Sequence, residues 1–377
     1  MSEQDYKPGL DGVISNITGL SFLDTEIEQI VIRGYDLIEL IQKCKYEDVA
    51  YLLIYGKLPS KSESEKFSHD LVKNSELPDD MYKLFELMPK TMSAMDALRT
   101  GISFLGGYED ETELMDTSKE SNERKALKIL AKAPTICVNS YRAIQNLPFV
   151  KPDKSMSYTE NFLYMVKGKK PDKTEIDILG KILTAYIEHE MPNSTFAVRV
   201  VASTLSDIYG SVASAVASLK GPLHGGANEA AMKMFLEVNN TVGPQGAKDY
   251  ILTKLKNKDK IMGFGHRVYM KKYDPRAFLL KDYIEGLTEK KPDGKNLYEI
   301  FKTIADTMGK EKGLYPNADY PIALLYYLID VPIDLYTPIF LCSRSAGLVA
   351  HHIEQHSDNR LFRPRVIYNG PRGLHPE

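Results

Sequence analysis

Four residues lie in sequence contexts that could carry out proton-transfer or anion-binding chemistry, and the first is His224. It sits in GPLHGG, where proline and glycine predict a turn that opens directly onto a helix. The positive end of a helix dipole disfavours imidazolium, so a neutral ring there can donate a hydrogen bond to a carbonyl. From spacing alone, an ordinary turn with an incidental polar residue is an equally good interpretation.

His266 follows two glycines, Gly263 and Gly265, in IMGFGHRVY, and Arg276 comes ten residues later in YDPRA. Glycine has no side chain, so main-chain groups at these positions can contact a ligand closely. A single G-x-G is weak evidence, and a structural loop is the simpler interpretation of the motif by itself.

Asp319 lies in YPNADYP, two residues before Pro321. Aspartate before a proline is a common start of a helix, so helix capping is the simplest interpretation of this motif alone. In a cleft that excludes water, the same carboxylate would become a stronger base and could act as a general base.

His189 is placed at the end of a helix predicted over 173–190, where a histidine most often contacts the last carbonyls. His352 and His356 in HHIEQH share one helix face, a spacing that suits zinc. No third ligand is evident nearby and the H-E-x-x-H order is absent, so no metal site is expected. The sequence also has no G-x-S-x-G elbow, Walker A motif or Rossmann glycine pattern.

The composition limits the function classes. The chain has 51 acidic and 48 basic residues, for a net charge of −3, which argues against a protein that coats nucleic acid or an anionic membrane. Only 12 of the 48 basic residues are arginines. Because arginine binds carboxylates and phosphates in a planar, bidentate manner, each one is a candidate anion ligand.

The elements that must position these residues are predicted to be helices. Apolar residues recur at intervals of three and four residues over most of the chain. This predicts an all-α fold with helices at 35–43, 46–55, 61–75, 93–104, 121–146, 157–167, 173–190, 195–219, 226–239, 244–257, 294–309, 320–330 and 335–356. Short β-rich runs over 11–33 predict a minor arm of strands, and 357–377 is predicted to be an extended arm. Segment 202–219, rich in alanine, serine and glycine, predicts a close helix–helix or subunit contact.

Length and cysteine usage add two expectations. A chain of 377 residues suggests two or three domains. Three widely spaced cysteines and an N-terminus without an apolar leader fit a cytoplasmic protein. The two most apolar stretches, 196–219 and 320–343, are interrupted by charges and prolines, so we expect core helices and no membrane span.

The motifs, taken together and in order, resemble citrate synthase of the archaeal and Gram-positive bacterial type, in the citrate synthase/2-methylcitrate synthase family. The similarity spans nearly the whole chain. It is carried by IRGYDLIEL, EDVAYLLIYGKLP, SYTENFLYMVKGKKP, HEMPNSTFAVRVVASTLSDIYG, KGPLHGGANE, GFGHRVY with YDPRA, YPNADYP, SRSAGLVAHHIEQ and RLFRPRVIYNGP.

The resemblance implies condensation of acetyl-CoA with oxaloacetate, followed by thioester hydrolysis to citrate and CoA. It assigns Asp319 as the base that removes a methyl proton and His224 as the donor to the thioester oxygen. His266 would polarise and protonate the oxaloacetate carbonyl. The methyl group is a very weak acid, so donors aimed at the enol oxygen must contribute several kcal/mol.

The resemblance also implies the substrate ligands. The oxaloacetate carboxylates would be bound by His189, Arg276, Arg344 and, from a second subunit, Arg363. Gly263, Phe264 and Gly265 would receive the CoA adenine, and Lys271 or Lys272 its phosphates. The spacing between His266 and Arg276 is one residue longer than is usual in the family, which leaves the register of the CoA lysine open.

The family fold implies a large helical domain, 1–221 with 326–377, and a smaller helical domain, 222–325, that closes over the cleft. It also implies a homodimer and no cofactor beyond the CoA thioester. Three alternatives stay open: a 2-methylcitrate synthase that uses propionyl-CoA or accepts both thioesters, a non-catalytic helical CoA-binding protein, and a zinc hydrolase built on His352 and His356. One methylene group changes the discrimination between two substrates by only about 1–3 kcal/mol, so the preference for acetyl-CoA or propionyl-CoA is the hardest property to predict.

Overall fold

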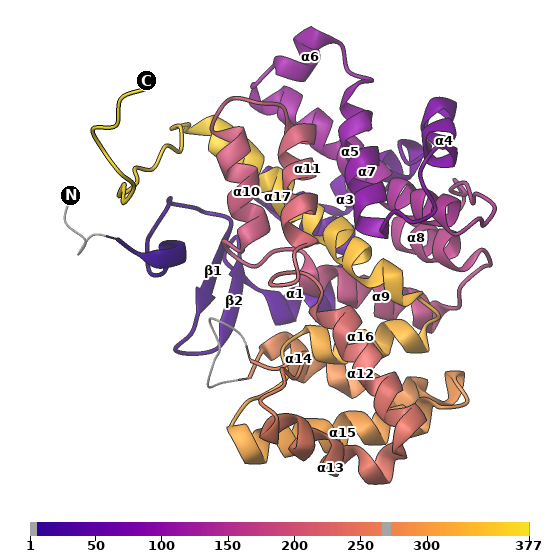
Figure 1. Cartoon of the computed structure of the whole chain (residues 1–377). Coiled ribbons are helices and arrows are strands. Elements are labelled where there is room, and N and C mark those ends of the chain that lie inside the picture. Colours follow the sequence, from indigo (N-terminus) through magenta and orange to yellow (C-terminus); the bar gives the residue numbers. More distant parts are fainter. Residues whose placement is uncertain (1–5, 266–272, 377) are drawn as a thin grey trace.

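The computed structural model describes residues 6–265 and 273–376. The chain is predominantly helical with one small sheet near its N-terminus, so the predicted all-α class with a minor β arm is confirmed (Figure 1). Three predicted site residues, His266, Lys271 and Lys272, lie outside the described residues.

The sheet is an antiparallel meander of β1 (Ser21–Asp24), β2 (Gln29–Ile32) and β3 (Tyr35–Asp36). Its register pairs Ser21 with Ile32 and Leu23 with Ile30, and these positions point to the same buried face. The alternation fits strands with one face on the core. Asp36 then caps the first helix by accepting from two of its amides.

The α-helices follow one another through the rest of the chain. They are α1 (Leu37–Lys43), α2 (Tyr46–Tyr55), α3 (Lys61–Lys73), α4 (Asp79–Glu86), α5 (Ala94–Gly106), α6 (Glu111–Met115), α7 (Lys119–Ile144), α8 (Tyr158–Lys167), α9 (Lys173–Tyr186), α10 (Asn193–Ala202), α11 (Ile208–Leu219), α12 (Ala227–Thr241), α13 (Gly243–Lys256), α14 (Pro275–Leu280), α15 (Gly294–Lys312), α16 (Asp319–Leu328) and α17 (Tyr336–Ser357). Short 3-10 turns occur at Pro8–Leu10, Lys281–Tyr283, Glu285–Lys290 and Ile333–Leu335.

Helix α17 runs through the core and is buried along nearly its whole length. It packs against α7, α10, α11, α2 and α9, so it is the common support for helices that are far apart in sequence. No helix among the described residues is long and apolar enough to cross a membrane. The apolar side chains of α17 are buried in the core.

Two predicted helices end earlier than expected. The stretch 195–219 is broken between α10 and α11, where Leu205 has a left-handed φ of 63°. The stretch 173–190 stops at Tyr186, and Glu190 has a φ of 63°. Long side chains disfavour this conformation, so it is held by tertiary contacts that a helical period does not reveal.

Three helices were not predicted: α4, α6 and α14, which have 8, 5 and 6 residues. They are too short to show a clear apolar period. The C-terminal residues after α17 contain no helix or strand as far as residue 376, which confirms the predicted extended arm.

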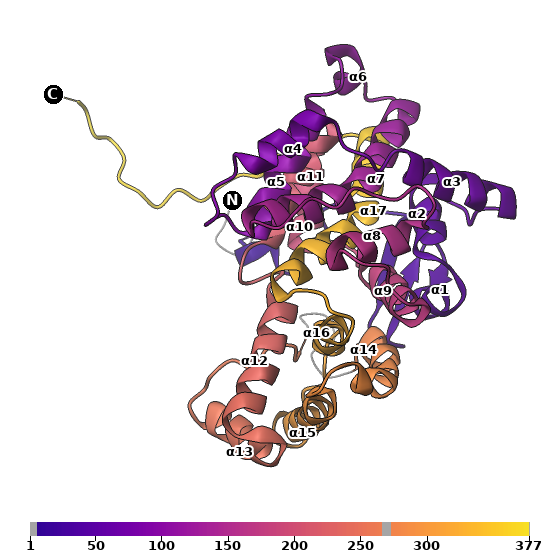
Figure 2. The ribbon, with the colours of Figure 1, turned by 90° about the vertical axis from the view of Figure 1, so that its right-hand side faces the viewer.

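Helices α12 to α16 lie together at one end of the molecule, away from the bundle that contains α5, α7 and α11, in both views of the ribbon (Figures 1 and 2). Helix α11 packs closely on α5 within the chain, because a side chain on Gly106 of α5 would lie 3.1 Å from Tyr209 of α11. The domain boundaries at 222 and 325 stay a prediction.

Candidate active site

The C-terminus of α9 is the anchor of the site. The last four carbonyls of a helix have no partner inside it, and they carry the negative end of the helix dipole. Here all four accept from nearby groups: Leu183 from the Ser343 hydroxyl, Thr184 from the Ile187 amide at 3.2 Å, Ala185 from Arg276 at 3.3 Å and Tyr186 from Arg344 at 2.6 Å. Two guanidinium groups are thus fixed at one helix end.

Asp274 also orients the Arg276 side chain. Its Nε and Nη2 donate to the two carboxylate oxygens at 3.0 and 2.7 Å, a bidentate pair that is almost fully buried. Asp274 also begins α14 by accepting from the Arg276 amide, and it accepts from the amide of Ala318 at 3.1 Å. The carboxylate therefore ties the start of α14 to the segment that carries Asp319.

Arg344 is buried without a carboxylate partner. It is 2% exposed, and Nε donates to the Tyr186 carbonyl, but no acidic group of the described chain lies within ion-pair distance. Burial lowers the pKa of Arg344 to about 10, partly offset by the more distant Glu188. The guanidinium stacks on the Phe340 ring at 4.9 Å. A buried cation with so few partners is poised for an anion.

Asp319 is the first residue of α16 and does not cap it, so the capping interpretation is wrong. The side chain of Asn317 accepts from the Asp319 amide instead, at 3.1 Å. This frees the Asp319 carboxylate, whose Oδ1 accepts from the Tyr186 hydroxyl at 2.5 Å. Burial raises the pKa of Asp319, while the Tyr186 hydrogen bond and the two arginines act in the opposite direction. A carboxylate of raised basicity is suited to take a proton.

His224 lies in the turn before α12, as predicted. Its Nε2 accepts from the Ser194 amide at 3.2 Å, and the Ser194 hydroxyl lies 2.9 Å away. That amide is one of the unpaired N–H groups at the start of α10. Since Nε2 is an acceptor, the proton of the neutral ring is on Nδ1.

The His224 ring is neutral at neutral pH. Burial lowers its pKa to about 4, with a further contribution from the positive charge of Arg344. The lowered pKa agrees with the predicted neutral form, and its causes are burial and the charge of Arg344. A neutral imidazole with one N–H can donate to a carbonyl oxygen without transferring the proton.

The glycines of the 263–265 stretch leave main-chain groups accessible to a ligand, and they also allow close packing. Gly263 has a φ of 83°, and a side chain there would lie 2.8 Å from the Tyr320 ring. The stretch pairs with 315–317, since the Asn317 amide donates to the Gly263 carbonyl and the Gly265 amide to the Tyr315 carbonyl. Phe264 packs on Tyr320 at 4.6 Å between ring centres. The 263–265 stretch is therefore joined to the turn that precedes Asp319.

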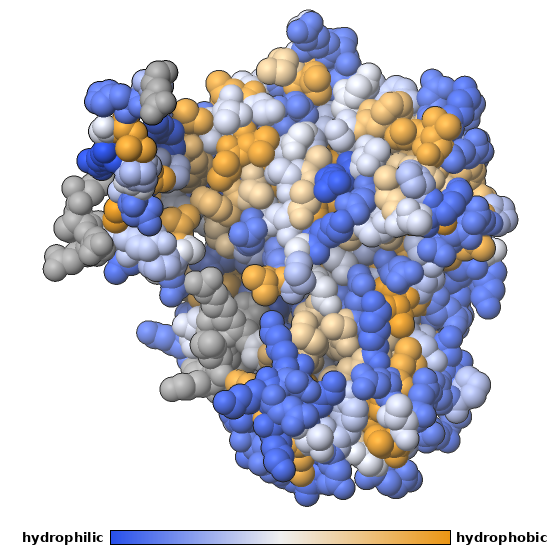
Figure 3. Space-filling view, viewed as in Figure 1, coloured by the Kyte–Doolittle hydropathy of each residue, from blue (hydrophilic) through white to orange (hydrophobic). Residues whose placement is uncertain are grey.

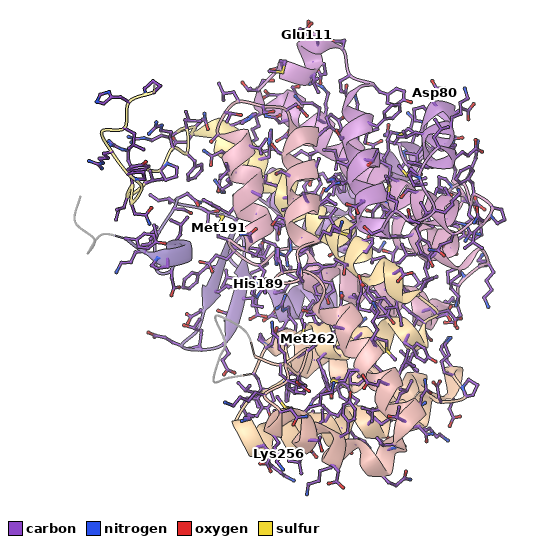
Figure 4. All side chains as sticks on the ribbon, viewed as in Figure 1. Asp80, Glu111, His189, Met191, Lys256 and Met262 are labelled. Carbon is purple, nitrogen blue, oxygen red and sulfur yellow. The ribbon has the colours of Figure 1, made fainter. Side chains whose placement is uncertain are left out.

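His189 follows α9 in irregular backbone and does not end the helix as predicted. It is 6% exposed and lies at mid-height of the molecule, between Met191 and Met262 in the view of Figure 4. Its neighbours are held from outside the segment: Ser21 accepts from the Glu190 amide and donates to Glu188, both at 2.9 Å. The N-terminal sheet therefore braces the segment that carries His189.

The structure brings several predicted residues into one electrostatic neighbourhood. Arg276 and Arg344 both act on the pKa of Asp319, and Arg344 acts on that of His224. Arg363 is exposed on the C-terminal arm and is not part of this group within the single chain. The figures show that arm leaving the body of the molecule (Figures 1 and 2).

Sequence reasoning missed three residues: Tyr186, Asp274 and Ser194. Asp274 had a local signal, because Asp-Pro at 274–275 is the cap pattern of a helix. Ser194 follows the Pro192 break, where a helix start leaves free amides. Tyr186 had no signal, since its partner is 133 residues away.

The metal interpretation of His352 and His356 finds no support. Nδ1 of His356 is 3.1 Å from the Asn122 amide nitrogen, and its Nε2 is 3.1 Å from the Ala202 carbonyl, so both ring nitrogens are engaged. Across residues 6–265 and 273–376, no group of three or more His, Cys, Asp or Glu side chains could hold a metal ion.

Comparison with known proteins identifies the family. The family model for the citrate synthase C-terminal domain matches residues 9–365. The chain is 50% identical over 370 residues to the citrate/2-methylcitrate synthase of Bacillus subtilis (strain 168), with 98% of each chain covered. It is 46% identical over 377 residues to the citrate synthase of Heyndrickxia coagulans, with 100% of each covered.

A solved structure agrees with this. The ternary complex of carboxymethyl coenzyme A and oxaloacetate with citrate synthase from Thermoplasma acidophilum matches with a TM-score of 0.91 and 36% identity, covering 99% of this chain and 98% of that one. The predicted resemblance is confirmed, and the non-catalytic alternative is set aside. The chain belongs to the citrate synthase family and is an acyltransferase with citrate synthase or citrate/2-methylcitrate synthase activity.

Proposed function

We propose that the enzyme condenses acetyl-CoA with oxaloacetate and water to give citrate and CoA, the entry step of the tricarboxylic acid cycle. Three observations support this: the buried, unpaired Arg344, the nearby carboxylate of Asp319 with its raised pKa, and the neutral His224. The observation that carries the proposal is Arg344, because a buried cation without a carboxylate partner needs a substrate anion.

In the first step, Asp319 takes a proton from the methyl group of acetyl-CoA. The electron pair moves towards the thioester oxygen, which accepts a hydrogen bond from Nδ1–H of His224. The low pKa of that ring keeps it a hydrogen-bond donor through this step. Donors aimed at the developing enol oxygen lower the barrier most where water is excluded.

In the second step, the enol carbon attacks the oxaloacetate carbonyl and a carbon–carbon bond forms. His266 would polarise that carbonyl and protonate the alkoxide. Water then hydrolyses the thioester and releases the CoA thiol. Arg276, Arg344 and His189 would bind the oxaloacetate carboxylates, since guanidinium groups orient them by paired hydrogen bonds.

The remaining assignments concern CoA and assembly. We propose that Gly263, Phe264, Gly265 and Lys271 contact CoA, with no separate cofactor, and that a cytoplasmic homodimer supplies Arg363 from a second copy. Support for an interface comes from the face over α10, where apolar side chains gather (Figure 3). Closure of 222–325 over the rest of the chain would exclude water from the reacting groups.

The alternative substrate is propionyl-CoA, which would give 2-methylcitrate. It is favoured by one observation, the dual name of the Bacillus subtilis relative. The test is release of free thiol from acetyl-CoA and from propionyl-CoA, each with and without oxaloacetate. We expect oxaloacetate-dependent release with a preference for acetyl-CoA. Dependence on oxaloacetate with a preference for propionyl-CoA would establish the alternative, and no release from either would refute both.

Asp319→Asn is the matched control for this assay. It removes the base but keeps the size of the side chain, so we expect turnover to fall by orders of magnitude while oxaloacetate still binds. Near-normal turnover in this variant would remove Asp319 from the mechanism.

A further inference from the structure

Tyr186 contacts both an acidic and a basic residue of the site. Its hydroxyl donates to Oδ1 of Asp319 at 2.5 Å, and its backbone carbonyl accepts from Nε of Arg344 at 2.6 Å. The side chain is 2% exposed. One residue at the end of α9 thus contacts the carboxylate and one of the guanidinium groups.

The hydroxyl of Tyr186 is directed towards the carboxylate. The Asn228 amide nitrogen of α12 approaches the phenol oxygen at 3.5 Å, a long contact in which the amide is the donor. A phenol oxygen that accepts from one side directs its own proton to the other. Asn228 is fully buried, and its Oδ1 accepts from the Glu229 amide at 2.7 Å, which fixes the orientation of its side chain.

The Tyr186 ring is fixed as well. It stacks on Phe340 of α17 with ring centres 4.1 Å apart and planes 22° apart. Phe340 also carries the Arg344 guanidinium, at 4.9 Å from its ring centre. Rotation of the Tyr186 ring would therefore disturb both partners, so the hydroxyl has little freedom to leave Asp319.

The two carboxylate oxygens of Asp319 are unequal as a result. Oδ1 is engaged by Tyr186, while Oδ2 makes no hydrogen bond with any residue that the structure describes. A carboxylate with one oxygen fixed and the other available has a defined direction for accepting a proton. We propose that Tyr186 is a positioning residue that fixes Oδ1 of Asp319 and so presents Oδ2 to the substrate methyl group. This inference rests on the proposed role of Asp319 as the base.

The charged and titratable groups that act on Asp319 define the expected pH dependence. Burial raises the pKa of the carboxyl, and Asp274 also raises it. The Tyr186 hydroxyl from α9, Arg276 from α14 and Arg344 from α17 all lower it. Loss of the hydroxyl would thus raise the pKa of Asp319 further, so that less of the base is ionised as the pH falls.

The test is Tyr186→Phe, which keeps the ring stack and the backbone carbonyl and removes only the hydroxyl. We expect kcat to fall about ten-fold, which corresponds to about 1.4 kcal/mol in the activation barrier, because the carboxylate loses the contact that orients it. The KM for oxaloacetate should stay within about two-fold, because Arg344 keeps its anchor. The acid limb of the kcat–pH profile should move to higher pH.

Tyr326→Phe is the matched control. Tyr326 is a fully buried tyrosine on α16, the helix of Asp319, and its hydroxyl has no hydrogen-bond partner among the described residues. We expect its kcat and pH profile to equal those of the wild type. An unchanged kcat and pH profile in Tyr186→Phe, or equal losses in the two variants, would overturn the proposal.

A second readout does not depend on turnover. The Asp319 carboxyl can be titrated by carbon-13 NMR in protein labelled at aspartate, with Asp319→Asn to assign the signal. We expect its titration to move to higher pH in Tyr186→Phe and to stay in place in Tyr326→Phe, and an unmoved titration would overturn the inference. A wild type without thiol release would instead refute the proposed function, and the titration would still decide the role of Tyr186.

Discussion

Two arginines with the same burial, Arg199 and Arg344, are partnered in opposite ways. Each is 2% exposed, and each contacts or belongs to the buried helix α17. Arg199 of α10 forms an ion pair with Glu354 and donates to His351 at 3.0 Å and to Gln355 at 3.1 Å. Its charge is therefore compensated inside the protein.

The Arg199 network extends to the N-terminal arm and to the segment of His189. Glu354 also accepts from Thr18 and from the Gly19 amide, at 2.8 and 2.9 Å. Since Nδ1 of His351 accepts from Arg199, its Nε2 donates to Glu188 at 3.1 Å. The network therefore stabilises the backbone around the site and engages all three nitrogens of the Arg199 guanidinium.

Arg344 has one carbonyl and one aromatic ring as its partners, and no carboxylate within ion-pair distance in the described chain. Burying a charge without compensation costs several kcal/mol, so such a residue is retained for a reason other than stability. The comparison teaches that, at equal burial, the number of partners separates Arg199, whose charge is compensated, from Arg344, which we propose binds substrate.

The largest effect that we expect from this comparison is on Arg199. Arg199→Met removes the cation of this network. Glu354 then loses its ion pair, and His351 loses its hydrogen-bond donor. We expect the free energy of unfolding to fall by about 3 kcal/mol, measured by urea denaturation. A loss below about 1 kcal/mol would show that the network does not stabilise the fold.

Arg344→Met should change stability much less. It removes a desolvated charge, and the cost is one unpaired carbonyl at Tyr186. We therefore expect the free energy of unfolding to stay within about 1 kcal/mol of the wild type, in the same denaturation experiment. If this variant loses as much stability as Arg199→Met, the distinction between the two arginines fails.

The smallest effect is on the pKa of His224. Burial is its main cause and remains in Arg344→Met, but the second cause, the charge of Arg344, is removed. We expect the pKa of His224 to rise from about 4 while staying below 6.5, measured by NMR of the imidazole. Arg199→Met should leave it unchanged, and an equal shift in both variants would contradict the comparison.

This shift has a consequence for stability, with a defined sign. The unfolded chain takes up a proton on His224 near pH 6.5, but the folded protein does so only near pH 4. The wild type therefore loses stability as the pH falls through this window. In Arg344→Met the loss over the same window should be smaller, and unfolding experiments at pH 7 and pH 4.5 would detect it.

Much of the fold and part of the site could be predicted from the sequence. Apolar periodicity located most helices, and the turn at His224 was visible in its glycines and proline. The roles of Arg276 and Arg344 came from the family resemblance, because a helical period does not show which arginine lacks a carboxylate. The motif around Asp319 by itself favoured a helix cap, but Asn317, two residues earlier, performs that task.

The contacts that could not be predicted are those between segments far apart in the chain. The Tyr186 hydroxyl meets Asp319 across 133 positions, and Arg199 meets His351 across 152. Local propensity carries no information about such pairs. The end of α9 was equally hidden, since three of its last four carbonyls accept from side chains of α14 and α17.

The most direct test of the central claim is calorimetric titration of oxaloacetate into the wild type, Asp319→Asn and Arg344→Met. The claim is that Arg344 is held buried and unpaired in order to bind a substrate carboxylate. We predict similar affinities for the wild type and Asp319→Asn, and about 100-fold weaker binding by Arg344→Met, as expected for a lost charged hydrogen-bond pair. Equal affinity in all three proteins would contradict the account.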